Sequence, residues 1–450
     1  MNKAQSTDLI HGSIAKSIFW FSVPLLVGNL FQQLYNTVDS YVVGNYVSKQ
    51  ALAAVGASTP LLNMLIGFFM GLATGAGVVI AQYYGAHDES RLKRAVHSSA
   101  ALTIAMAIVL TILGVIMTEP LLYAVGIPDD VFPQSAVYLK IYFSGIAFNL
   151  IYNMGSGVLR AIGDSRRPLY FLVIASLVNV ILDFIFVKYM QMGVAGAGFA
   201  TVISQAMSSI LVVAVLMKTN EMYRLVIKDI RFDFSILKRI IMIGLPTGFQ
   251  QSITSLSNVV VQSYVNAFGS SVVAGYSACI RIDGFVNLPL QSFNMAITTF
   301  VGQNIGAKQY DRVKKGTRIT MFMTMAVIGM TAMALFIFGK DFIAIFNNER
   351  DVIEAGRTMQ MAFIPFYIVL PLVQIYSGVL RGAGKSSVPM YIMLFNMVIL
   401  RQIYLFIITK ITSSVYYVFM GWPVTWVTCA IMFVVYYHLV KWLPTELNSQ

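Results

Sequence analysis

The sequence predicts an all-α integral membrane protein with twelve transmembrane helices, arranged as two six-helix repeats (an N-lobe and a C-lobe) around a central cleft. The chain of 450 residues is 57% hydrophobic and only 11% charged, whereas soluble domains carry about 25% charged residues. Apolar runs long enough to cross a bilayer, which takes about 20 residues, recur from end to end. The two halves of the chain also repeat one another, and this repeat predicts the division into lobes.

Twelve apolar segments are expected to span the membrane. They cover residues 16–41, 52–82, 96–118, 135–159, 168–188, 194–217, 237–267, 273–300, 316–338, 357–380, 388–410 and 415–440. Most Lys and Arg residues fall in the loops of one side, and the positive-inside rule makes that side, with both termini, cytoplasmic. The net charge of +12 therefore indicates orientation in the cell membrane. We expect contact with lipids, no nucleic-acid partner, and a monomer.

The internal repeat fixes the domain organisation. With an offset of about 221 residues, GVLRAIGDSRRPLY at 157–170 aligns with GVLRGAGKSSVPMY at 378–391, and Pro24 aligns with Pro246 after one residue of slippage. We therefore expect an N-lobe at residues 1–217, a cytoplasmic loop at 218–236 and a C-lobe at 237–450. An even number of spans in each half gives parallel repeats, which place substrate sites near the midplane at the repeat interface.

The first span contains an aspartate at membrane depth. Such a charge costs about 2.5–3.5 kcal/mol on insertion scales, so a carboxylate there is a functional candidate. Gln32, Tyr35, Asn36 and Asp39 occupy positions i, i+3, i+4 and i+7 of the predicted helix and share one face. Because lipid offers no hydrogen bonds, this face is expected to contact protein or water.

Two more acids, Asp183 and Asp283, fall within predicted spans. Asp183 shares a helical face with Ser176 and Asn179, and Asn153 lies on a polar face of the preceding span. Two carboxylates in one low-dielectric pocket repel each other, and burial disfavours their charge, so a carboxylate there can take up and release a proton. Oxygen ligands from the same groups would also suit a sodium ion. The residues alone do not decide between a proton and a sodium ion. The alternative to an ion site is that these groups only form hydrogen bonds between helices.

The C-terminal half differs from the N-terminal half. Its first span has amides and hydroxyls but no acid, and we expect the polar residues of its first two spans to form a wall facing the substrate: Gln251, Asn258, Asp283, Asn287 and Gln291. Gln32, Tyr35 and Asn36 are the corresponding candidates in the first half. Asp283 has a structural alternative, a neutralising ion pair with Arg281 or Arg401.

These motifs resemble the MATE (multidrug and toxic compound extrusion) family over essentially the whole chain. The resemblance rests on PLLVGNLFQQLYNTVD at 24–39, AAVGASTP at 53–60 and GVLRAIGDSRRP at 157–168. It implies a secondary antiporter that exports amphiphilic, often cationic compounds in exchange for protons or sodium by rocking two lobes. It further implies a cation-linked site in the N-lobe, with Asp39, Asn153, Asn179 and Asp183 at the matching positions and Thr201 as a fifth member.

Proton coupling through Asp39 and Asp183 is our first hypothesis, and sodium coupling at the same site is the alternative. A lipid-linked oligosaccharide flippase is disfavoured because most basic residues lie in loops or near span ends, and only Arg281 and Arg401 lie deeper, too few for a basic cleft. A receptor or scaffold leaves the repeat and the buried acids unexplained. The chain has no GxxxxGK[ST] loop for ATP, and its four histidines lack metal-ligand spacing. We therefore expect no enzyme activity, no cofactor and no metal other than the sodium of the alternative.

Overall fold

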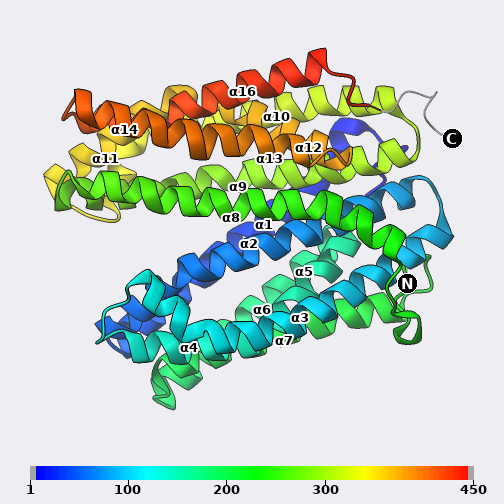
Figure 1. The fold of residues 1–450 in the computed structure, drawn as a ribbon, viewed down its shortest axis with the longest axis horizontal. Helices are drawn as coiled ribbons and strands as arrows, with labels where there is room; N and C mark the ends of the chain where they lie inside the picture. The colour runs from blue at the N-terminus through cyan, green and yellow to red at the C-terminus, as the bar shows by residue number, and fades with distance from the viewer. Residues whose placement is uncertain (1–6, 444–450) are drawn as a thin grey trace. The chain divides into compact units, whose positions relative to one another are not determined.

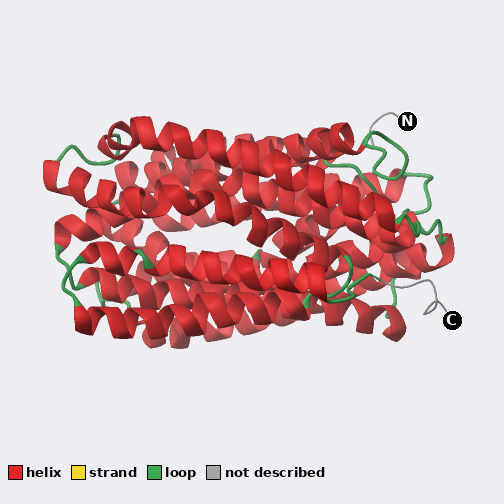
Figure 2. Cartoon of the chain, turned by 90° about the horizontal axis from the view of Figure 1, so that it is seen from above, coloured by secondary structure: helices red, strands yellow, loops and turns green. Residues whose placement is uncertain are grey.

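A computed structural model describes residues 7–443, apart from the side chains of residues 49, 57, 59–61 and 63. Helices joined by short loops make up nearly all of this part of the chain, and no strand occurs in it (Figure 2). The helical fold predicted from the sequence is confirmed.

The chain divides into two compact units, and the helices of unit 1 come largely from the first half of the sequence (Figure 1). They are α1 (Ile14–Tyr46), α2 (Lys49–Gly85), α3 (Glu89–Val125), α4 (Phe132–Ser144), α5 (Ile146–Ala161), α6 (Arg166–Asp183), a π-helical turn η2 (Phe184–Tyr189) and α7 (Gly193–Lys218). Within unit 1, α5 packs against α2, α3 and α7, while α7 also packs against α6.

The helices of unit 2 come largely from the second half. They are α8 (Phe234–Asn266), α9 (Ser270–Gly306), α10 (Tyr310–Ala344), α11 (Arg350–Phe363), the 3-10 segment η4 (Ile364–Val369), α12 (Leu370–Gly382), α13 (Ser387–Leu394), the π-helical turn η5 (Phe395–Leu400), α14 (Arg401–Ile411), α15 (Val415–Phe419) and α16 (Gly421–Leu439). Within unit 2, α9 packs against α10, α11 and α12, and α12 packs against α16.

Each predicted span coincides with one helix or with one run of consecutive helical segments. Among the described residues, nine helices are long and apolar enough to cross a membrane. The three other predicted spans are α4 with α5, which separate at Gly145, and α8 and α9, which carry the polar faces noted above. Interruptions also match between the halves, because α4–α5 and α11–α12 are both broken near their middle.

Two helices belong to both units. Unit 1 comprises the described residues up to Asp8 and Val23–Gly244, whereas unit 2 comprises Leu9–Ser22 and the described chain from Leu245 onward. Helix α1 therefore changes unit one residue before Pro24, and α8 changes unit one residue before Pro246. The lobe boundaries predicted from the sequence stay a prediction.

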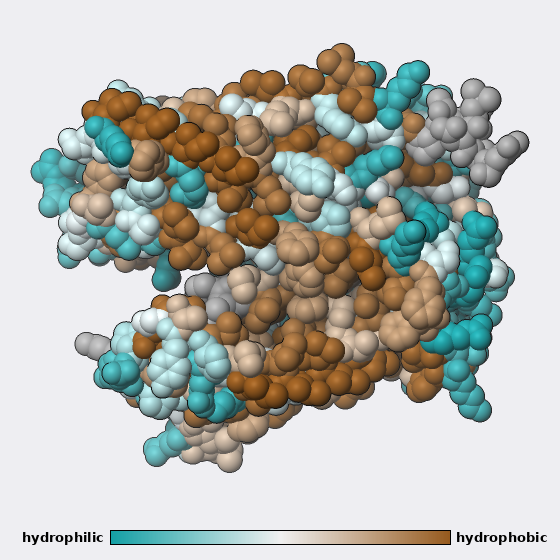
Figure 3. Space-filling view, in the orientation of Figure 1, coloured by the Kyte–Doolittle hydropathy of each residue, from teal (hydrophilic) through white to brown (hydrophobic). Residues whose placement is uncertain are grey.

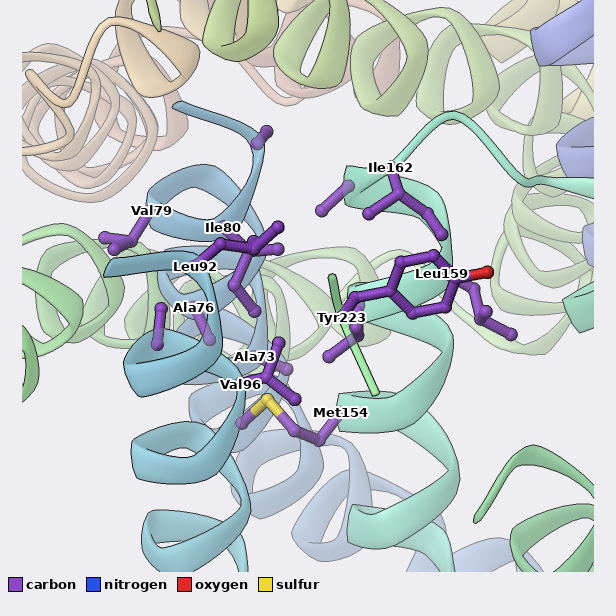
Figure 4. Close-up of a cluster of buried hydrophobic side chains, with 14 of the residues drawn as sticks. Ala73, Ala76, Val79, Ile80, Leu92, Val96, Met154, Leu159, Ile162 and Tyr223 are labelled. Atoms are coloured by element: carbon purple, nitrogen blue, oxygen red, sulfur yellow. The ribbon is translucent and has the colours of Figure 1, made fainter. Parts of the chain in front are cut away.

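The hydrophobic core of unit 1 includes the start of α8 and the loop before it. Ala76, Val79 and Leu92 of α2 and α3 lie close to Leu159 of α5, and Tyr223 of the loop packs among them (Figure 4). Ile236, Ile240 and Ile243 of α8 belong to the same cluster. The first three turns of α8 are thus part of the unit 1 core.

Glycines permit the closest helix crossing in this region. A Cβ atom on Gly75 of α2 would lie 2.5 Å from the carbonyl oxygen of Ile240, and a Cβ atom on Gly244 would lie 2.7 Å from the Cα atom of Leu72. Real side chains do not tolerate such distances, so only glycine fits at this crossing. Gly75 of the glycine-rich stretch GLATGAG at 71–77 thus serves close helix packing.

The outer surface suits a lipid environment. Large apolar side chains are exposed along α3, α6 and α10, for example Ile112, Ile116, Leu177, Met330 and Phe336. In Figure 3, broad hydrophobic areas cover the visible helix surfaces, and hydrophilic residues gather toward the helix ends. This pattern is typical of helices that cross a bilayer.

Candidate functional site

Two carboxylates of unit 1 lie close together inside the helix bundle. Asp39 of α1 is 7% exposed, and Asp183, the last residue of α6, is fully buried. The two carboxylates interact electrostatically. No ion pair in the described part of the chain includes either one. Two acids without a cationic partner are therefore buried together.

The polar atoms around this pair also lack partners. Among the described residues, the buried atoms without a hydrogen bond include Asp39 Oδ1, both carboxylate oxygens of Asp183, the side-chain oxygen and nitrogen of Asn179, and Thr201 Oγ1. The hydroxyl of Tyr35 lies beside Thr201. Buried polar atoms normally find hydrogen bonds, so this group has the capacity to bind a proton or a cation.

The local fold of α6 explains how Asn179 and Asp183 come to face inward. Ser176, Asn179 and Asp183 occur at i, i+3 and i+7 and are all buried, as expected for one face of a helix. Directly after Asp183 the helix widens into the π-turn η2. π-turns are frequent at functional sites because they shift the register of the following side chains.

Tyr138 of α4 is a member of this neighbourhood that sequence reasoning missed. Its side chain is 5% exposed and interacts electrostatically with Asp39, Asp183 and Tyr35. The available signal was a pair of tyrosines, Tyr138 and Tyr142, spaced i and i+4 in an apolar helix. Such a pair is common in cores, and helical spacing within α4 does not show which acids of other helices its tyrosines approach.

Asn153 has its described contacts elsewhere. Its amide donates to the side-chain oxygen of Asn149 and to the Asn149 carbonyl, both at 2.9 Å. It lines a small pocket with Asn149, Thr103 and three methionines, Met70, Met106 and Met154. No described contact joins Asn153 to Asp39 or Asp183, so its membership of the cation site stays a prediction.

The predicted polar face of α1 divides into buried and exposed residues. Tyr35 is half-buried beside Thr201, whereas Gln32 and Asn36 are exposed. Exposed amides in the middle of an apolar helix cannot be satisfied by lipid. Gln32 and Asn36 are therefore suited to a water-filled or substrate-facing surface.

Unit 2 presents a similar polar surface on α8 and α9. Asn258 and Gln291 are exposed, and Gln251 and Asn287 are half-buried. Thr254 and Ser255 direct their hydroxyls to carbonyl oxygens one turn earlier on α8. The amide of Asn287 donates to Asp283, and the amide oxygen of Asn258 accepts from Arg401, so these two side chains already have partners within unit 2.

Asp283 does not form either of the ion pairs considered from the sequence. Its carboxylate accepts a hydrogen bond of 2.9 Å from the Tyr367 hydroxyl and one of 3.0 Å from the amide of Asn287. Arg281 is exposed and lies over the ring of Phe346. The structural alternative of an ion pair with Arg281 or Arg401 is therefore not formed among the described residues, because neutral donors one turn away on α9 and on η4 reach the carboxylate instead.

Long apolar helices, two repeated units and an unpaired buried carboxylate pair together define a multi-pass membrane protein of the transporter class. The MatE family model matches residues 24–185 and again residues 246–407. The chain therefore belongs to the MATE family of multidrug and toxic compound extrusion transporters. The two matches begin at Pro24 and Pro246, which confirms the repeat found in the sequence.

Known relatives agree with this assignment. The chain is 28% identical over 436 residues to "Probable multidrug resistance protein YoeA" of Bacillus subtilis (strain 168), covering 95% of this chain and 94% of that protein. Its fold is similar to that of a MOP superfamily transporter from Pyrococcus furiosus, with a TM-score of 0.90, 22% identity and coverage of 97% and 98%. An outward-facing multidrug resistance MATE family transporter gives a TM-score of 0.89 at 23% identity, with the same coverage.

Proposed function

We propose that this protein is a proton-coupled antiporter that exports amphiphilic, often cationic compounds by alternating access. The observation that carries the proposal is the carboxylate pair of Asp39 and Asp183, buried together with no cationic side chain paired to them and with unbonded oxygens, as far as the described residues show. Multidrug resistance in the names of the relatives supports drug export as the task.

The pair provides a physical basis for coupling. Two negative charges cannot both persist in a buried pocket, because each loses its hydration and each repels the other. Uptake of one proton removes the repulsion, and its release restores it. A conformation that opens the pocket to one side favours uptake, and a conformation that opens it to the other side favours release, so the two states differ in proton affinity.

Proton coupling is proposed over sodium coupling because hydrogen-bond donors as well as acceptors surround the pair. The amide nitrogen of Asn179 and the hydroxyls of Tyr35 and Tyr138 can donate to a carboxylate. A sodium ion requires oxygen ligands alone. The oxygens of Asp39, Asp183, Asn179 and Thr201 would hold it if sodium proves to be the coupling ion.

The exposed polar residues are proposed to contact the exported compound. Gln32 and Asn36 in unit 1 and Asn258 and Gln291 in unit 2 offer amide oxygens to a cationic or hydrogen-bonding substrate. The family adapts to many compounds, and apolar side chains beside these amides would supply the adaptable part of the contact. We further propose a monomer in the cell membrane with both termini cytoplasmic, in keeping with the distribution of Lys and Arg.

Gradient-driven efflux from vesicles tests the proposal. The purified protein is reconstituted with ethidium, and a pH gradient or a sodium gradient is imposed separately. We expect the pH gradient alone to drive ethidium movement, and Asp39→Asn to abolish it because the neutral amide cannot take up the coupling proton. Asp229→Asn, which changes an exposed aspartate of the loop before α8, serves as the matched control. Movement driven by sodium alone, or full activity of Asp39→Asn, would refute proton coupling at this site.

A further inference from the structure

A buried arginine of unit 2 has only neutral partners. Arg401, the first residue of α14 after the π-turn η5, is 2% exposed. Its guanidinium donates to Asn258 Oδ1 at 3.3 Å, to Thr425 Oγ1 at 3.1 Å and to Met397 Sδ at 3.5 Å. No carboxylate of the described residues forms an ion pair with it. A positive charge at membrane depth is therefore stabilised without a negative one.

The guanidinium of Arg401 also has an N–H donor without a partner among the described residues. An arginine has five N–H donors in a planar fork that matches a carboxylate. The Nε atom of Arg401 is buried and has no hydrogen-bond partner, and the bonds to Asn258 and Met397 are long. Charged donors of this kind bind an anion more strongly than a neutral amide or a thioether. The surroundings of Arg401 thus fit an anionic group better than the partners that it has.

Aromatic side chains separate this positive charge from a negative one. The indole of Trp422 lies 5.4 Å from the guanidinium carbon, and Tyr276 packs against Trp422 with ring centroids 5.9 Å apart. Tyr276 interacts electrostatically with both Arg401 and Asp283. Asp283 is only half-buried, and its hydrogen bonds come from neutral groups. Trp422 and Tyr276 are each 6% exposed, so unit 2 holds two opposite charges beside a buried aromatic cluster.

Asn258 gives access to the arginine from the exposed polar face of α8. Its side chain is exposed, whereas Arg401 behind it is buried. The contact between them is the 3.3 Å bond to Nη1. A carboxylate that reaches this face can replace the amide oxygen of Asn258 at the guanidinium, with rotation of one side chain.

We propose that Arg401 and Asn258 form a carboxylate-binding subsite in unit 2, which gives a compound that carries a carboxylate a further point of attachment. The carboxylate of the compound takes the place of the Asn258 amide oxygen at Arg401, and its cationic end is drawn toward Asp283. This inference rests on the proposed function, since it takes the bound compound to be an exported substrate.

A matched pair of dyes tests the subsite. Rhodamine 110 carries a free carboxylate, and rhodamine 123 is its methyl ester with the same ring system. Affinities are measured by fluorescence anisotropy with the full-length protein in phosphatidylcholine nanodiscs, which contain no anionic lipid to compete. A charge-assisted hydrogen bond predicts that the wild type binds the acid about tenfold more tightly than the ester. Equal affinities in the wild type would overturn the inference.

Two variants of the subsite give independent outcomes. Arg401→Gln removes the charge, and Asn258→Asp keeps the arginine but places a carboxylate where the ligand would bind. Both are expected to reduce the acid-to-ester affinity ratio from about ten to about one. Asn258→Asp leaves the buried side chain in place, so it answers the question even if Arg401→Gln does not fold. Retention of the ratio by a folded Asn258→Asp or Arg401→Gln protein would contradict the proposal.

The exposed Arg281 of the same unit provides the control. Arg281→Gln makes the same chemical change on the surface of α9 and is expected to keep the ratio near ten, and loss of the ratio in this variant would overturn the assignment to Arg401. Rhodamine 123 efflux under a pH gradient is measured in parallel. Efflux of the ester without an affinity ratio refutes only the subsite, whereas the expected ratio without efflux supports the subsite and refutes the proposed transport.

Discussion

At the scale of single residues, Tyr138 matters because it lies near both acids of the carboxylate pair. Its buried side chain interacts with both Asp39 and Asp183, so its hydroxyl can stabilise whichever carboxylate is charged. We expect Tyr138→Phe to slow pH-driven ethidium efflux by about tenfold, the effect of one hydrogen bond to a charged group. Melting temperatures should change little because the ring remains. Tyr391→Phe, at an exposed tyrosine of α13, should retain the wild-type rate.

The acids of this site could be predicted from the sequence, but several of the residues around them could not. Asp39, Asn179 and Asp183 stand out because carboxylates and amides are costly inside a membrane and recur at helical spacing. Tyr138 and the partners of Arg401 come from contacts between helices far apart in the chain, such as Arg401 with Asn258. Helical spacing contains no information on such contacts, and for this reason the partners of Asp283 stayed open at the level of the sequence.

At the scale of helices, the crossing of α2 and α8 brings a described glycine of unit 1 closest to the backbone of another helix. We expect Gly75→Ala to lower the melting temperature, since its Cβ atom would lie 2.5 Å from the Ile240 carbonyl oxygen and force the helices apart. Overpacking of this kind costs about 1–3 kcal/mol. The measurement is thermal unfolding of the detergent-solubilised protein, followed by size-exclusion chromatography.

Gly329→Ala is the matched control for that substitution. Gly329 lies within α10, and a Cβ atom there would meet no atom within 4 Å. The melting temperature of this variant should stay the same or rise slightly, because alanine favours a helix over glycine. Similar melting temperatures for the two variants would show that the α2–α8 crossing tolerates a side chain.

The positions of the helices were predictable from the sequence, whereas the breaks within them were not. Hydropathy located the spans at 135–159 and 357–380, but α4 ends at Ser144 and the 3-10 segment η4 occupies Ile364–Val369. Pro365 and Pro371 are a local signal for the second break, since proline provides no backbone N–H. The π-turns η2 and η5 have no comparable residue signature, because they arise from packing.

At the scale of the whole molecule, the division into units predicts how fragments behave. The segment 23–244 contains the continuous part of unit 1, including Tyr223, Ile236, Ile240 and Ile243 of its core. Burial of each large apolar side chain contributes about 1.5–3 kcal/mol in water. We therefore expect fragment 23–244 to have a clearly higher melting temperature in detergent than fragment 23–217.

Fragment 23–266 is the control for length. It adds the part of α8 that belongs to unit 2, so it should gain no further stability over 23–244. A steady rise in melting temperature from 23–217 through 23–244 to 23–266 would show that helix length, rather than membership of unit 1, determines the stability.

The exchange of helix ends at Pro24 and Pro246 also bears on the origin of the duplicated chain. A chain that encoded one repeat alone would lack the segment that its core takes from the other half, as unit 2 takes Leu9–Ser22 and holds its Leu9 carbonyl through Asn304. Such a chain completes its fold only by lending its own first turns to a second copy, which is a domain-swapped dimer. Fusion of two copies into one gene then converts the exchange of helix ends between two chains into an exchange within one chain. Each repeat can afterwards diverge in sequence, although its core still needs a segment from the other repeat.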